Sequence, residues 1–398
     1  MINYCGIFKN MGVSKNNINN MKYFLTGGLK KSGIIIWRYV FNAKEKDSGT
    51  EKQFFIELEM LNPYLSPSET VLGFTPRNTI KAEDLQYALA GTASATEMML
   101  EKYVQPSYVA VKFGAFGAKA KQFCFYDTIQ NTKISQHQFS VQTGSCFFSD
   151  KHLSGFVNYT KSEIREHPEY MSQDGYAEWN IDYEIIMDFD KGYNGKTSVW
   201  FPIGLKTNFS GSLNYCGTDY VVDPMSSFGY FDKTWGKTLQ SPYFHISATS
   251  LSSLISGRTL FNSSFVSHGL FEDRASLIIN FEGNELSFCA DENKRNYTCI
   301  WDCQEIKQND IDKLHWSLSV TSKTWIVDID IFCDITELFN KVIELPEGSR
   351  KTLSMLTSCS GNGEIKLFKK VKDNLEQIEY LRISKALCEF GLFEEAEK

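Results

Sequence analysis

Hydrophobic residues in this chain occur mostly in short runs rather than at helical spacing. The runs are rich in β-branched and aromatic side chains and end at Gly, Asn, Asp or Pro, which is the pattern of β-strands. The predicted strands are 33–41, 53–60, 108–113, 138–142, 155–159, 212–222 and 276–281. Residues 285–288 continue a hairpin through the turn Glu282-Gly283-Asn284. We therefore predict an all-β, mainly antiparallel fold built as a sandwich or barrel.

The second of these strands shows the alternation most clearly. Glu57 and Glu59 alternate with Ile56, Leu58 and Met60. Successive side chains of a strand point to opposite faces. The pattern predicts a strand with one solvated face and one buried face.

Helical patterns are few. Residues 83–103 carry apolar side chains every three to four positions, and Thr160 with Glu163 forms a capping-box pattern before a short helix that Pro168 ends. Residues 371–393 repeat apolar side chains near one helical face. Those positions are Val371, Leu375, Ile378, Leu381 and Leu387. We predict a few short helices and a C-terminal helix that packs across the end of a barrel.

Length and composition favour two domains. The chain has 398 residues, of which 42% are hydrophobic, 22% charged and an unusually high 14% aromatic. We place an N-terminal tail at 1–21, a first β domain at 22–200 and a second at 201–398, with the boundary near 191–208.

Charge and targeting patterns narrow the class of partner and the compartment. The net charge of −7, without a long basic run, gives no electrostatic footprint for nucleic acid. No run reaches the ~18 apolar residues of a membrane-spanning helix, and the N-terminus lacks a signal-peptide pattern. The ten cysteines show no framework spacing and are predicted to be reduced thiols. We expect a cytoplasmic protein without integral membrane insertion.

The segment Gly229 to Gly236, GYFDKTWG, sets charged side chains among aromatic rings. A carboxylate at Asp232 is costly to bury without a partner. Two interpretations follow. Asp232 and Lys233 form a structural clasp where two domains meet, or Asp232 is an acid that acts on an apolar ligand.

The same segment resembles the tocopherol cyclase-like proteins, a group that includes carotenoid hydratases and lipocalin-like Diels-Alder cyclases. The resemblance rests on Gly229, Tyr230, Asp232, Lys233, Trp235, Gly236, Ser241 and Pro242, and extends to residues 54–63, 106–117 and 167–179. It spans about residues 22 to 370. Asp232 stands where the family usually has Glu.

The resemblance implies two consecutive lipocalin-like β domains and a hydrophobic, isoprenoid-type substrate. The implied activity is cofactor-independent, acid-assisted cyclisation or hydration, the work of an isomerase or hydro-lyase. A shared fold does not fix chemistry. The alternative is a non-catalytic carrier of lipophilic small molecules, since β-barrel mouths bury apolar ligands without reacting with them. No cofactor and no metal are expected.

Cyclisation or hydration begins with protonation of a carbon–carbon double bond. Burial raises the pKa of a carboxyl group, and ring faces stabilise a carbocation. The predicted catalytic residues are Asp232 as the acid, with Tyr230 and His245 as helpers. Strand parity places Tyr230 and Asp232 on one face, and Lys233 and Trp235 on the other. A hydrogen-bonded core histidine is the commoner role for His245.

The predicted substrate-binding residues are Trp235, Trp37, Arg38, Glu57 and Phe244. If Glu57 and Glu59 faced a cavity, one carboxyl group would be held neutral by the other. Solvent exposure is the commoner outcome for such a pair. Arg38 would attract an anionic head group or form an ion pair at the rim.

Overall fold

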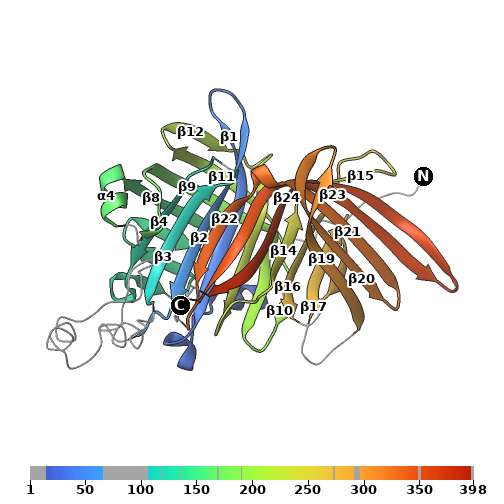
Figure 1. The fold of residues 1–398 in the computed structure, drawn as a ribbon, viewed down its shortest axis with the longest axis horizontal. Coiled ribbons are helices and arrows are strands. Elements are labelled where there is room, and N and C mark those ends of the chain that lie inside the picture. The colour runs from blue at the N-terminus through green and yellow to red at the C-terminus, as the bar shows by residue number, and fades with distance from the viewer. Residues whose placement is uncertain are drawn as a thin grey trace.

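The computed structural model describes residues 15–65, 106–117, 119–135, 137–167, 170–189, 191–271, 274–290, 296–347 and 351–395. These residues form two barrel-like sheets in which every strand pairing is antiparallel (Figure 1). The all-β, antiparallel fold class is confirmed. The predicted helix at 83–103 lies outside the described residues. Within the described part of the chain, no helix has the length and hydrophobicity to cross a membrane.

The first sheet contains the strands from β1 to β13. They are β1 (Ile34–Glu45), β2 (Glu51–Leu61), β3 (Tyr108–Ala115), β4 (Gln122–Asp127), β5 (Lys133–Ser135), β6 (Ser140–Thr143), β7 (Cys146–Ser149), β8 (His152–Tyr159), β9 (Gly175–Met187), β10 (Tyr193–Asn194), β11 (Ser198–Tyr215), β12 (Thr218–Val222) and β13 (Phe228–Gly236). Their main order is β4-β3-β2-β1-β12-β11-β9-β8-β7-β6-β5, and β13 pairs with both β1 and β11.

The second sheet contains the strands from β14 to β24. They are β14 (Tyr243–Ala248), β15 (Leu251–Ser253), β16 (Ser264–Phe271), β17 (Arg274–Phe281), β18 (Asn284–Phe288), β19 (Tyr297–Gln308), β20 (Ile311–Ser322), β21 (Trp325–Asp334), β22 (Phe339–Glu344), β23 (Lys351–Val371) and β24 (Asn374–Glu395). The predicted hairpin across residues 282–284 is present as β17–β18. The chain passes between the sheets at 237–242. The predicted domain boundary at 200/201 lies inside β11, and the division into domains stays a prediction.

The helical elements among the described residues are short. They are α1 (Lys15–Lys22), α4 (Lys161–Glu166) and the 3-10 helices η1 (Gly27–Lys30), η3 (Ile129–Asn131) and η5 (Ile335–Glu337). The predicted capping box at the start of α4 is present. The Thr160 hydroxyl accepts from the Glu163 backbone N–H at 3.3 Å, and the Glu163 carboxylate accepts from the Thr160 N–H at 2.7 Å.

The predicted C-terminal helix is wrong, because this segment is the long strand β24, which pairs along its length with β23. Leu375 and Ile378, two of its presumed buried positions, are exposed. Leu381 and Ile383 are buried on either side of exposed Arg382, which is strand alternation. The apolar residues that fell at helical spacing were therefore a mixture of exposed and buried positions of a strand, not one buried face of a helix.

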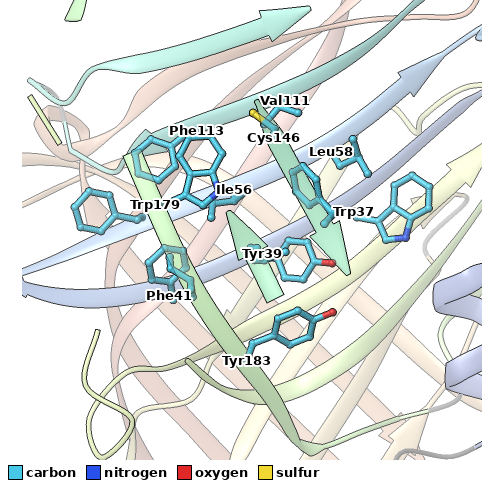
Figure 2. Packing of buried hydrophobic residues seen from close by; sticks show 14 of the residues in the cluster. Trp37, Tyr39, Phe41, Ile56, Leu58, Val111, Phe113, Cys146, Trp179 and Tyr183 are labelled. Carbon is cyan, nitrogen blue, oxygen red and sulfur yellow. The ribbon is translucent and has the colours of Figure 1, made fainter. Parts of the chain in front are cut away.

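Aromatic side chains fill the inner face of the first sheet. Trp37 and Tyr39 on β1 point into this core, and Phe113 on β3 stacks on Trp179 of β9 with ring centres 4.8 Å apart (Figure 2). Many of the aromatic side chains of the chain therefore pack in the core of the first sheet. A separate core inside the second sheet includes Trp316 and Ile365.

The outer face of β1 and β2 packs against the second sheet. Val40 and Phe55 share a buried cluster with Leu387 of β24, and Phe55 stacks on Phe339 of β22 with ring centres 6.3 Å apart. The prediction of one solvated face for β2 is wrong because β22 and β24 cover the face that would otherwise meet water.

The glycine that opens the GYFDKTWG segment allows the close approach of β13 to β1. A β-carbon built at Gly229 would lie 1.9 Å from the Val40 carbonyl oxygen. Any side chain there forces the two backbones apart.

We expect Gly229→Ala to lower the free energy of unfolding by at least about 2 kcal/mol in urea denaturation, because the strands must separate. Gly28→Ala is the matched control. Its β-carbon would meet no atom within 4 Å, and its effect should stay below about 0.5 kcal/mol. Equal effects of the two substitutions would contradict the steric explanation.

Candidate functional site

Four charged side chains form a row across the first sheet on the face toward the second. Asp232 on β13 lies opposite Arg38 on β1, which lies opposite Glu57 on β2, which lies opposite Lys112 on β3. Opposed residues of neighbouring strands point to the same face. All four are buried. The signs alternate, so each charge lies beside opposite ones.

Arg38 joins the two sheets. Its Nη2 lies 2.7 Å from Oδ2 of Asp232 and its Nε lies 3.2 Å from Oδ1, a two-pronged contact. Its Nη1 donates to the carboxylate of Glu389 on β24. Burial disfavours the guanidinium charge, but Asp232 and Glu389 outweigh burial and raise the pKa of Arg38. Arg38 is therefore a permanent cation held between two carboxylates.

Asp232 accepts further hydrogen bonds from within the first sheet. Trp200 Nε1 donates to Oδ2 at 2.9 Å, and the Tyr230 hydroxyl donates to the same oxygen at 3.0 Å. Together with Arg38, every polar contact described for Asp232 comes from a donor. Asp232 is therefore the hydrogen-bond acceptor of three side chains from β1, β11 and β13.

The Glu57 and Glu59 pair is buried, and the expectation of solvent exposure is wrong. Each carboxylate has its own lysine: Lys341 of β22 donates to Glu57, and Lys112 lies 2.6 Å from Glu59. Tyr108 also donates to Glu59 at 3.2 Å. Burial would raise the pKa of Glu57, but nearby lysines and Arg38 lower it overall. Each carboxylate is thus paired with a cation rather than with the other carboxylate.

His245 lies on β14 at the same junction. Its Nδ1 is 3.5 Å from Nη2 of Arg38, and a guanidinium only donates, so this nitrogen is an acceptor. Nε2 then carries the proton and donates to Oγ of Ser247 at 3.1 Å. His268 lies 3.3 Å from Nδ1. Burial, Arg38 and His268 hold the pKa of His245 well below its usual range, which makes it a neutral hydrogen-bonded histidine.

Three predicted ligand contacts lie away from this junction. Trp37 and Trp235 are on the inner face of the first sheet, with the Lys233 amine 4.5 and 5.3 Å from their rings. Phe244 belongs to the core of the second sheet. The structure thus brings together Asp232, Tyr230, His245, Arg38 and Glu57, and separates them from the other three, as strand parity had indicated for Trp235.

Lys233 serves the local structure of the first sheet. Its amine donates to the backbone carbonyls of Asn20 at 2.6 Å and Met21 at 3.2 Å, in the last turn of α1. Cations are favourable at a helix C-terminus. Burial lowers the pKa of Lys233, so these carbonyls compensate a charge that has left water.

Two cavities border the junction. The first, lined by Arg38, Glu57, Asp232, Tyr243 and Lys341 among others, has a volume of about 20 Å³, which is room for about one water molecule. The second has a volume of about 340 Å³ and lies between β1 and β13 of one sheet and β14, β15, β23 and β24 of the other. Tyr230 lines the larger cavity and also contacts Asp232.

Several residues of the junction were not predicted. They are Trp200, Ser247, His268, Lys341 and Glu389. Strand alternation would have placed Ser247 on the face of His245, two residues earlier. Trp200 fell in the presumed domain boundary and Glu389 in the presumed helix. Among the described residues, no three His, Cys, Asp or Glu side chains gather as a metal site would require.

Comparison with known proteins gives no family. No protein-family model and no curated protein matches the chain. Two solved structures are similar in shape: a Nitrosomonas europaea protein provisionally called AttH, and kievitone hydratase from Nectria haematococca. The first has a TM-score of 0.44 and 10% identity, covering 88% of this chain and 92% of that one. The second has a TM-score of 0.42 and 11% identity, covering 93% of this chain and 94% of that one. At these TM-scores neither likeness bears on what this chain binds.

We expect Arg38→Met to lower the free energy of unfolding by about 3 to 5 kcal/mol, because it leaves two buried carboxylates without their cation. Urea denaturation at pH 7 measures the loss. Lys44→Met is the control, since Lys44 is a half-exposed partner 3.9 Å from Glu51 and should cost less than about 1 kcal/mol. A stable Arg38→Met protein would show that the ion pairs contribute nothing to the junction.

The lowered pKa of Glu57 predicts a pH-dependent stability difference. At pH 7, Glu57→Gln should be less stable than the wild type, because the ionised carboxylate stabilises the folded state. This contribution is present above the unfolded pKa of about 4.3 and disappears as the pH falls through the lower folded pKa. Denaturant unfolding between pH 7 and pH 3 should show the gap closing. Glu305→Gln is the control, because an exposed side chain on β19 should change the free energy of unfolding by less than about 0.5 kcal/mol. A pH-independent gap for Glu57→Gln would refute the assignment.

Proposed function

We propose that the protein binds a hydrophobic small molecule in the larger cavity between its two sheets. The observation that carries the proposal is the cavity itself. Its volume of about 340 Å³ lies in the range of small-molecule sites, about 300 to 1,000 Å³. Interfaces between domains and the mouths of β-barrels are frequent places for such sites.

The walls of the cavity suit an apolar ligand with a polar group. Val40, Leu251, Leu260 and Leu387 supply aliphatic surface from both sheets. Ser247 adds a directed polar contact. Since its oxygen accepts from His245, its own hydroxyl hydrogen is available to a ligand.

Binding without reaction is the function that the geometry supports best. Asp232 lines the smaller cavity, where a ligand larger than water has no room, and it is engaged by Arg38, Trp200 and Tyr230. Asp232 then maintains the wall of the site rather than acting on its content. A carrier or receptor for lipophilic molecules needs no more than this.

Acid-assisted cyclisation or hydration, the chemistry of tocopherol cyclase-like proteins, is the second candidate. Tyr230 favours it, because this predicted catalytic residue lines the larger cavity. Its proton is directed to Asp232, and burial beside that carboxylate raises the pKa of Tyr230. Tyr230 therefore gives up its proton less readily than a tyrosine in water, which weakens this candidate relative to binding alone. A lipophile that is extracted with the protein and is converted on incubation with it, to an isomer of equal mass by cyclisation or to a product heavier by one water by hydration, would support this chemistry.

The binding proposal predicts that the neutral dye Nile red binds the cavity and fluoresces there. Thr259→Trp should weaken this binding at least about tenfold, or about 1.4 kcal/mol, because the indole fills space at the exposed edge of the cavity. Fluorescence titration measures the dissociation constant.

Thr298→Trp is the matched control. Thr298 is an exposed threonine on β19 of the second sheet and does not line the cavity. It should leave Nile red binding unchanged. Equal binding by both variants, or no binding by the wild type, would overturn the proposal.

A further inference from the structure

Lys206 supplies a buried cation to the wall of the larger cavity. It lies on β11 and is only 2% exposed. Its amine donates to the backbone carbonyl of Phe261 and lies 4.4 Å from the centre of the Phe228 ring. An ammonium has three donor hydrogens, so one carbonyl leaves capacity for another acceptor.

The charged neighbours of Lys206 do not neutralise it. Glu51, which also lines the cavity, is paired with Lys385 and lies 3.9 Å from Lys44. Glu282 acts on Lys206 only at longer range, and among the described residues no carboxylate forms an ion pair with Lys206. Among its described lining residues, the cavity therefore holds one cation whose charge is not balanced nearby.

The other titratable groups of the cavity do not supply that balance. Burial raises the pKa of Tyr230 and of Cys359, so both stay neutral at pH 7. Uncompensated buried charge is costly, and a ligand that brings the opposite charge recovers part of that cost.

Two large apolar side chains lie at the exposed edge of the cavity, beside Thr259 and the Glu51–Lys385 ion pair. Met225 and Phe261 line it and are 83% and 73% exposed. Large apolar side chains this exposed beside a cavity mark a place where apolar molecules bind or enter. In the part of its lining that the structure describes, the cavity thus offers aliphatic walls, exposed apolar side chains at its edge and one buried ammonium.

We propose that the cavity takes an aliphatic carboxylate, with its chain against the apolar walls and its carboxylate paired with Lys206. This inference rests on the proposed function and specifies the ligand class. One ammonium balances one negative charge, which fits a monoanionic carboxylate. The carboxylate replaces or joins the Phe261 carbonyl as an acceptor for the amine.

The pairing carries a pH dependence with a definite sign. Burial lowers the pKa of Lys206 to about 8, with a smaller opposing effect from Glu282. A bound carboxylate stabilises the ammonium, so binding above this pH requires proton uptake. Affinity for the carboxylate therefore falls as the pH rises through about 8, whereas affinity for an uncharged ligand does not.

Displacement of Nile red by dodecanoic acid and by 1-dodecanol tests the inference. The wild type at pH 7 should prefer the acid by at least about tenfold, as expected for a hydrogen bond to a charged group. Lys206→Met should remove this preference while keeping its affinity for the alcohol, which also shows that the variant is folded. At pH 9.5 the wild-type preference should likewise disappear.

Lys313→Met is the control, since Lys313 on β20 is 3.4 Å from Asp334 and does not line the cavity. It should keep the preference for the acid. The inference is overturned if the wild type does not prefer the acid, or if Lys206→Met prefers it as strongly as the wild type. Nile red binding that Thr259→Trp does not weaken would instead refute the binding proposal, so the two failures are distinguishable.

Discussion

The contact between the two sheets depends on one buried guanidinium. Arg38 leaves water entirely and compensates this cost by bonding to Asp232 within its own sheet and to Glu389 of the other. Apolar surfaces alone allow two sheets to slide, since hydrophobic contact has no direction. Because Arg38 must stay within reach of both Asp232 and Glu389, it restricts sliding of one sheet over the other. The row of alternating charges includes this side chain, and the smaller cavity is lined by it.

The local features of the fold could be predicted from the sequence. Short β-branched and aromatic runs identified strands, and turn residues identified the β17–β18 hairpin. The capping box at Thr160 was legible because its two hydrogen bonds join residues three positions apart. Strand parity also separated Asp232 from Trp235. Each of these features depends on neighbours within a few residues.

The features that could not be predicted depend on distant partners. Glu57 and Glu59 looked solvated because alternation cannot show that a second sheet covers the polar face. Lys341, the partner of Glu57, is 284 positions away along the chain. The C-terminal segment looked helical because its exposed apolar residues happened to fall at helical spacing. The hydrogen bonds of Asp232 to Arg38 and Trp200 became visible only in the structure, because both partners lie on other strands.

The late position of β24 in the sequence affects the order in which the two sheets can fold. The first sheet is complete in sequence at Gly236, yet the strand that covers Arg38 is β24, and Arg38 and Glu389 are 351 positions apart. A ribosome adds about 5 to 20 residues each second. During synthesis, the charged row therefore waits for many seconds in contact with water. Its solubility in that interval protects a surface that would otherwise be an apolar, aggregation-prone face.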